Sequence, residues 1–335
     1  MAWCWCNATV SKPQNVSDQL KKVEKLKSTY LVTISRSVRQ INQSINIMNQ
    51  SIRKIIYFPI TKIILGITVC FSLFVGIQNF VSKPLFYSII KDKNTADPII
   101  HLVSFFVLLS SYYFLFRWYE KREIKELSIK YLPKEMFGGF AFGFSAISLS
   151  IFILYLLGYY HIIDILTEDY SLKLFMTLVV AALIEDLFTR GLVLRELENW
   201  LGTNIAILII MVIETYHIFN PNATLFSFFV SLCWGFTMSM LFVYTKRVWL
   251  PFFFHLGWNF AQPFYGSNLT GLDDMGKIIH SKFEGPVLFT GGGIGIEDSI
   301  ITVFILFSIG VFLYHRSNKE SKIIKRKTLK VKPNR

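Results

Sequence analysis

Charged residues are scarce in this chain: only 17% of its 335 residues are Asp, Glu, Lys or Arg, whereas 53% are hydrophobic. A soluble domain of this size would carry more charge and fewer long apolar runs, so this composition argues against one. Cysteines are also few, and the four that occur (Cys4, Cys6, Cys70 and Cys233) are scattered, which does not suit a disulfide-bonded scaffold. The long apolar runs therefore decide the class of protein.

Eight apolar runs each approach the roughly 17–25 residues that cross the hydrocarbon of a bilayer. They are residues 58–81, 99–116, 137–159, 172–197, 203–219, 225–244, 248–264 and 299–314. Because short connections separate the runs, the sequence predicts an all-α polytopic membrane protein with about eight transmembrane helices. Three segments follow from this pattern: a basic N-terminal segment 1–56, a transmembrane domain 57–315 and a basic tail 316–335.

The net charge of +13 is concentrated near the two termini. Residues 1–54 hold nine Lys and Arg against two acidic residues, and the tail after Tyr314 holds nine against one. Basic ends of this kind can bind nucleic acid, but the positive-inside rule also accounts for the basic loop 117–134, so we expect no nucleic-acid partner. Alternation over eight spans then places both termini in the cytoplasm. We expect a multi-pass protein of the plasma membrane of a prokaryote.

The segment before the first apolar run has its own periodicity. From Leu31 to Ile55 apolar residues recur in a strict three–four alternation, and this average spacing of 3.5 favours a left-handed coiled coil. Self-association into a homo-oligomer is therefore one prediction for residues 31–55. The alternative is a single amphipathic helix that lies on the inner leaflet and contacts anionic lipid through its basic residues.

The stretch "LIEDLFTRG" places three charged residues where an apolar helix is expected. Asp186 and Arg190 are four residues apart, so they share a helix face and can neutralise each other. Glu185 points about 100° away from them and has no partner in its own helix except Thr189. Because charge inside a membrane helix is costly, Glu185 needs another explanation.

Two further polar groups are expected near Glu185. A turn at Gly202 would fold the chain into a hairpin, and equal spacing on its two sides brings His217 level with Glu185. On a later helix, "HLGWN" places His255 and Asn259 four residues apart, so both side chains occupy one face. The sequence therefore predicts a polar site inside the helical bundle.

Hydrolysis of an amide bond suits this set of residues. A carboxylate and an imidazole that meet at one water molecule act as a general base, and an imidazole and a carboxamide can donate to the oxyanion that forms. Glu185, His217 and His255 could instead hold Zn²⁺ with water as fourth ligand. However, the sequence has no H-E-x-x-H motif, and no Ser or Cys stands beside these histidines as a nucleophile. We therefore expect either no cofactor or Zn²⁺.

The motifs "EDLFTR", "ETYHIFN" and "HLGWN" resemble those of the CPBP family of intramembrane proteases, which comprises CAAX proteases and bacteriocin-processing enzymes. The resemblance covers about residues 173–261. It implies that Glu185 and His217 activate water, that His255 and Asn259 form an oxyanion hole, and that Arg190 orients the carboxylates. The implied substrate is a membrane-anchored protein, such as a prenylated CAAX protein, or a hydrophobic peptide.

The chain departs from the family pattern at two positions. Asp186 stands where the family has a second Glu, and Ile213 stands where a Phe is usual. The substitution at Asp186 leaves room for weak activity or for an inactive family member that acts as a membrane scaffold. A proton-coupled transporter that uses Glu185 and the histidines as a relay is the other alternative.

Overall fold

The computed structural model describes residues 20–25, 27, 39, 42–43, 46–48, 50–165, 172–273 and 276–326. The chain divides into two compact units, Met1–Phe58 and Pro59–Arg335. In the first unit, Met48, Ile52 and Ile55 of the predicted heptad pattern are exposed. Most of that pattern lies outside the described residues, so self-association through residues 31–55 stays a prediction.

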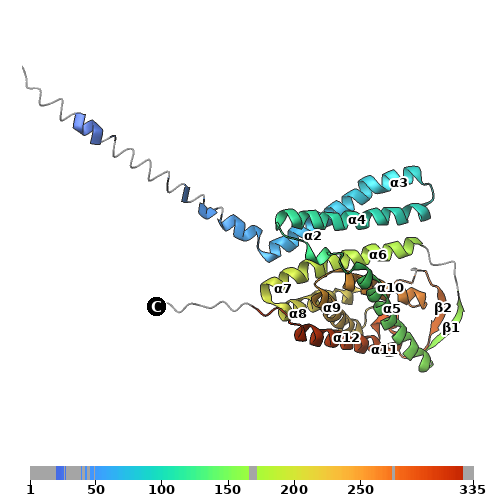
Figure 1. Cartoon of the computed structure of the whole chain (residues 1–335). Coiled ribbons are helices and arrows are strands. Elements are labelled where there is room, and N and C mark those ends of the chain that lie inside the picture. Colours follow the sequence, from blue (N-terminus) through green and yellow to red (C-terminus); the bar gives the residue numbers. More distant parts are fainter. Residues whose placement is uncertain are drawn as a thin grey trace, which may run out of the picture. The chain divides into compact units, whose positions relative to one another are not determined.

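The second unit is built almost entirely of helices (Figure 1). In the first half of its sequence the helices are α2 (Pro59–Ile77), η1 (Gln78–Ser82), α3 (Lys83–Ile89), α4 (Lys93–Tyr119), η2 (Lys125–Leu127) and α5 (Leu132–Leu156). Those on its second half are α6 (Leu172–Asp186), η3 (Leu187–Leu194), α7 (Arg195–Leu201), α8 (Thr203–Glu214), η4 (Thr215–Phe219), α9 (Leu225–Thr245), α10 (Trp249–Phe264), α11 (Val287–Thr290), η5 (Ile296–Asp298) and α12 (Ile300–Lys319). The only sheet among the described residues pairs β1 (Tyr160–Ile165) with β2 (Ile279–Phe283) in antiparallel fashion.

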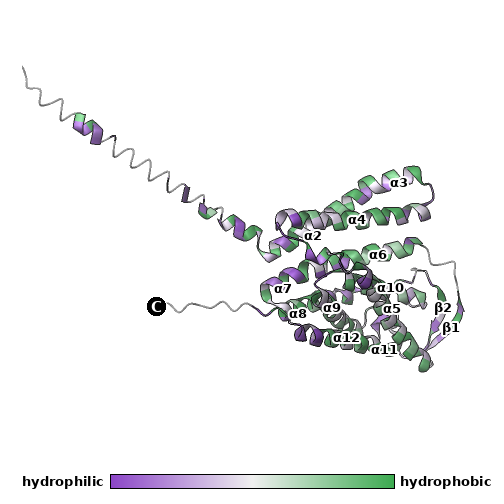
Figure 2. Ribbon diagram, viewed as in Figure 1, coloured by the Kyte–Doolittle hydropathy of each residue, from purple (hydrophilic) through white to green (hydrophobic). Residues whose placement is uncertain are grey.

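Five helical segments are long and apolar enough to cross a membrane, and apolar residues dominate them in Figure 2. These segments are Pro59–Ile89, Lys93–Tyr119, Leu132–Leu156, Leu225–Thr245 and Ile300–Lys319. The predicted all-α polytopic membrane fold is therefore confirmed. The predicted number of eight spans is not confirmed, because α8 and α10 have only 12 and 16 residues and charged residues interrupt the stretch from α6 to α7.

The connections of the second unit gather at two ends of the bundle (Figure 1). At the first end, which we call the basic end, Lys62 pairs with Glu120, and Lys246 at the end of α9 pairs with Glu198 on α7. At the opposite end, which we call the sheet end, β1 and β2 pair, and Lys173 at the start of α6 pairs with an aspartate near the start of α4. The long helices α4, α5, α9 and α12 therefore each run from one end to the other.

Glycines allow α5 and α10 to pack closely. A Cβ atom added at Gly143 would lie 2.0 Å from the carbonyl oxygen of Phe254, and one added at Gly257 would lie 2.1 Å from that of Phe140. Small residues let helix backbones approach in this way inside membranes. Because His255 lies between Phe254 and Gly257, this packing fixes the position of the α10 polar residues.

Candidate active site

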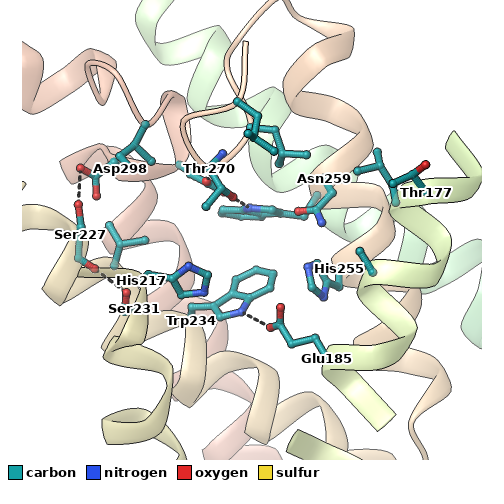
Figure 3. A pocket seen from close by; sticks show the side chains of 18 residues that line it. Thr177, Glu185, His217, Ser227, Ser231, Trp234, His255, Asn259, Thr270 and Asp298 are labelled. Atoms are coloured by element: carbon teal, nitrogen blue, oxygen red, sulfur yellow. Dashed lines mark hydrogen bonds between the residues drawn. The ribbon is translucent and has the colours of Figure 1, made fainter. Parts of the chain in front are cut away.

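A cavity of about 310 Å³ lies within the second unit, between α6, η4, α9 and α10. Two connections of the sheet end, residues 269–272 and 294–298, complete its lining. All four side chains predicted to be catalytic line this one cavity, and Figure 3 shows them around it: Glu185, His217, His255 and Asn259. The structure thus brings together residues that are up to 74 positions apart in the sequence.

Arg190 joins three carboxylates beside the cavity. Its Nη1 lies 3.1 Å from Glu185 Oε1 and 3.4 Å from Asp186 Oδ1, and its Nη2 lies 2.7 Å from Glu214 Oε1. The side chains of Arg190, Asp186 and Glu214 are fully buried, whereas that of Glu185 is 22% exposed. Glu185 is therefore the member of the cluster that is open to a ligand.

The expectation that Glu185 lacks a partner in its own helix, other than Thr189, was wrong. Helix α6 continues into the π-helix η3, in which hydrogen bonds join residues five apart rather than four. Because of this wider turn, the Arg190 side chain contacts Glu185, which lies five residues earlier in the chain, as well as Asp186. Thr189 instead donates its hydroxyl to the backbone carbonyl of Glu185 and accepts a hydrogen bond from Arg190.

Side chains from neighbouring elements support the π-helix. The carbonyl oxygen of Gly191 accepts hydrogen bonds from the Tyr112 hydroxyl at 2.7 Å and from Arg195 Nε at 3.0 Å. Gly191 itself is tightly surrounded, because a Cβ at this position would lie 3.0 Å from Val248. π-Helical turns are frequent at functional sites, and here the turn sets the positions of Glu185 and Arg190.

His255 is held by Asp186. Its Nδ1 lies 3.0 Å from Asp186 Oδ2, and the residue is only 5% exposed. This contact leaves the other ring nitrogen, Nε2, for a ligand in the cavity. The Trp234 ring packs edge-on against the imidazole with a centroid distance of 5.0 Å, and Asn259 lines the cavity one helical turn further along α10. Asp186 is thus a positioning residue for His255 as well as a partner of Arg190.

His217 reaches the cavity from a different kind of element. Helix α8 ends at Glu214, and His217 follows in the short 3₁₀ helix η4, where its ring stacks on Tyr216 at 4.2 Å. Glu185 Oε1 accepts a hydrogen bond of 3.4 Å from Trp234 Nε1. Within the described chain no hydrogen bond joins Glu185 to His217, so their common ligand would be a molecule in the cavity that both line.

We call the two sheet-end connections that line the cavity, residues 269–272 and 294–298, its roof. Two acidic residues of this roof were not predicted from the sequence. Glu297 accepts hydrogen bonds from the backbone N–H of Thr270 and from Gln262 Nε2, both at 2.8 Å. Asp298 accepts hydrogen bonds from the hydroxyls of Thr224 and Ser227 at 2.8 and 2.9 Å. The local signal was an acidic pair that follows the glycine-rich stretch "TGGGIG" after one isoleucine.

The Asp298 carboxyl is buried in this roof. Burial raises its pKa to about 6, although the hydrogen bonds from Thr224 and Ser227 lower it, and the neighbouring Glu297 raises it further. In the folded protein this carboxyl therefore keeps its proton to a higher pH than an ordinary aspartate does. The hydrogen bonds of the same carboxyl anchor the roof loop to the start of α9.

The zinc alternative named Glu185, His217 and His255 as ligands. In the part of the chain that the structure describes, no group of three or more His, Cys, Asp or Glu side chains is placed so that it could hold a metal ion. This arrangement does not fit a three-residue zinc site, and no step below uses a metal.

Residues 167–261 match the family described as type II CAAX prenyl endopeptidase, Rce1-like. The predicted family resemblance is confirmed. The matched segment runs from just before α6 to α10 and contains Glu185, Arg190, His217, His255 and Asn259. No curated protein and no solved structure matches the chain.

Proposed function

We propose that the protein is a CAAX-type intramembrane endopeptidase that hydrolyses a peptide bond in a membrane-associated protein or a hydrophobic peptide. One observation carries this proposal: Glu185, His217, His255 and Asn259 come from two helices and a 3₁₀ turn, and all line one cavity. Polar side chains inside apolar helices are costly, so their convergence on a cavity indicates function. The family match to residues 167–261 supports the same class of reaction.

Glu185 and His217 would activate the attacking water. Glu185 is the one exposed carboxylate of the Arg190 cluster, and Arg190 and Trp234 fix its Oε1. Its other oxygen, Oε2, is then free to accept a proton from water in the cavity, and His217 can orient the same water. The proton passes to the leaving amine when the tetrahedral intermediate collapses.

His255 and Asn259 would stabilise the oxyanion. Since Asp186 accepts a hydrogen bond from His255 Nδ1, the Nε2 atom carries a proton only when the ring is an imidazolium. That proton and the Asn259 carboxamide can both donate to the substrate carbonyl oxygen as negative charge develops on it. Asp186, whose carboxylate lies 3.0 Å from Nδ1, would balance the positive charge of the ring.

Glu214 would hold Arg190 in place for Glu185 and Asp186. Arg190 contacts both of these carboxylates through Nη1. Glu214 takes Nη2 of Arg190 at 2.7 Å and is fully buried. It therefore fixes the guanidinium from the α8 side and ties α8, which leads to His217, to the π-helix.

The orientation in the membrane follows from charge. We propose that both termini are cytoplasmic, because the basic end of the bundle holds most of the lysines and arginines of the connections. The multi-pass protein would lie in the plasma membrane of a prokaryote, with its basic tail and N-terminal segment at the inner leaflet.

The purified full-length protein in detergent tests this proposal. We expect it to cleave at least one of a set of fluorogenic peptides that includes farnesylated and unmodified CAAX peptides, with the new termini identified by mass spectrometry. His255→Gln and Asn259→Ala should lower kcat more than they raise KM, since an oxyanion donor acts on the transition state. Asn79→Ala, at an exposed position of η1, is the control. Folded protein that cleaves none of the peptides would contradict the proposal.

A further inference from the structure

We infer, on the basis of the proposed function, that the substrate enters the cavity from the non-cytoplasmic side of the membrane. The peptide that is cleaved would then be an exported hydrophobic peptide or an external segment of a membrane-anchored protein. A protein that stays in the cytoplasm would not reach the site. Three features of the described residues lead to this conclusion: the connections that form the roof of the cavity, the packed side chains that close its opposite side, and the charges of the two ends of the bundle.

Every part of the cavity lining outside the long helices belongs to the sheet end. Thr270 and Leu272 follow α10, Glu297 and Asp298 precede α12, and His217 follows α8. The lining residues of α9 lie toward the same end, in the first half of that helix, and those of α10 lie at its middle and in its second half. No lining residue comes from a connection of the basic end. Water and peptide therefore reach the site past the connections of the sheet end.

Packed side chains close the cavity toward the basic end. Leu187, Met238, Leu241 and Phe252 lie beyond the lining residues of α6, α9 and α10 in that direction, and each is at most 1% exposed. All four belong to the main hydrophobic core. The fully buried Arg190 cluster lies at the same level. A peptide that came from the basic end would have to displace this core.

The two ends differ sharply in charge. The described connections of the basic end, residues 117–134, 195–201, 246–247 and 316–326, hold fourteen Lys and Arg against six Asp and Glu. Those of the sheet end, residues 90–97, 157–165, 220–224, 265–273 and 276–299, hold four Lys, no Arg and seven Asp and Glu. Lysine and arginine in short loops mark the cytoplasmic side of membrane proteins, so the sheet end and its cavity face away from the cytoplasm.

Cysteine labelling in intact cells tests the side of access without any need for activity. In a full-length chain whose four cysteines are changed to Ala, Leu272→Cys reports on the cavity rim and Ile129→Cys on the basic end; these side chains are 52% and 69% exposed. We expect a membrane-impermeant maleimide to label Leu272→Cys in intact cells and Ile129→Cys only after permeabilisation. The reverse pattern, or labelling of both in intact cells, would overturn the inference.

Peptide cleavage by membrane vesicles of known orientation is a second test of the side from which substrate enters. Right-side-out and inside-out membrane vesicles that contain the full chain receive the same fluorogenic peptide, made impermeant by a sulfonated dye. We expect at least tenfold faster cleavage by right-side-out vesicles, and equal rates after detergent is added. Faster cleavage by inside-out vesicles would overturn the inference. If detergent-solubilised protein also fails to cleave, the proposed function fails, whereas the labelling result still decides the orientation.

Discussion

His255 and Asp186 are joined across the bundle: the Nδ1 atom of the α10 imidazole lies 3.0 Å from an oxygen of the last residue of α6. Asp186 stands where the resembling family has a second Glu, and it is this residue that contacts the histidine of the proposed oxyanion hole. The shorter Asp186 side chain reaches both this ring and Arg190, the latter at 3.4 Å. The substitution is therefore compatible with an ordered site.

Asp186→Asn should slow catalysis without unfolding the protein. An amide in this position can keep a hydrogen bond to Nδ1 but cannot balance the charge of the imidazolium, so we expect kcat to fall by about 10–100-fold, less than the loss of a whole oxyanion donor. KM should change little.

Asp186→Glu restores the carboxylate that the family pattern has at this position, and we expect it to retain most of the activity. Steady-state cleavage of one fluorogenic peptide by both variants measures the effect, with Asp164→Asn in the exposed strand β1 as the matched control. Wild-type kcat in Asp186→Asn would show that His255 needs no charged partner.

The close packing of α5 on α10 should be sensitive to a single methyl group. Gly143→Ala places a Cβ 2.0 Å from a backbone oxygen of α10, so the helices must separate. We expect a loss of stability of about 1–3 kcal/mol, as for overpacked cores, and a loss of activity because His255 and Asn259 move with α10.

Gly138→Ala is the matched control for this prediction. It lies in the same helix, but nothing lies within 4 Å of an added Cβ. We expect its thermal unfolding midpoint in detergent to equal or slightly exceed that of the wild type, because Ala favours helix more than Gly does. A Gly143→Ala variant as stable and active as Gly138→Ala would contradict the packing argument.

Asp298 should make stability depend on pH. Its pKa is raised to about 6 in the folded protein, against an ordinary value of 3.8, so the folded state binds the proton more tightly than the unfolded state does. The resulting stabilisation is present below about pH 4 and is lost as the pH rises through about 6. Asp298→Asn keeps an acceptor for Thr224 and Ser227 but does not ionise.

Thermal unfolding in detergent between pH 4 and pH 8 measures this effect. We expect the unfolding midpoint of the wild type to fall relative to that of Asp298→Asn as the pH rises from 4 to 7. Asp273→Asn, in an exposed part of the same connection, should follow the wild type. Parallel curves for wild type and Asp298→Asn would show that this carboxyl titrates normally.

Metal removal separates the carboxylate mechanism from the zinc alternative. We expect peptide cleavage by the purified protein to persist after treatment with 1,10-phenanthroline, since Glu185, His217 and His255 do not gather as a metal site. Loss of activity on chelation, with recovery on addition of Zn²⁺, would contradict this expectation.

Local periodicity predicted much of the site but not all of it. The i,i+4 spacing placed Asp186 with Arg190 and His255 with Asn259, and the turn at Gly202 brought His217 to the same cavity as Glu185. The partner of Glu185 was not predicted, because a regular α-helix sets residue 190 on another face and only the π-helix corrects this.

Features that depend on long-range contacts were beyond the sequence pattern. The ion pair of Glu214 with Arg190 and the anchoring of Asp298 by Thr224 join residues whose spacing carries no helical signal. The predicted number of eight membrane spans is not confirmed: among the described residues five helical segments are long and apolar enough to cross, and an apolar run does not reveal how long its helix is. Peptide cleavage distinguishes the protease from an inactive scaffold, and proton flux in proteoliposomes without cleavage would favour the transporter.

The central claim is that Glu185 and His217 act together on one water molecule, and a double-mutant cycle tests it most directly. The kcat/KM of wild type, Glu185→Gln, His217→Ala and the double variant would be measured with one fluorogenic peptide. We predict that each single variant loses at least about 10²-fold, as expected for a general base, and that the double variant loses no more than the worse single one. Wild-type kcat/KM in either single variant, or losses that multiply in the double variant, would contradict the account.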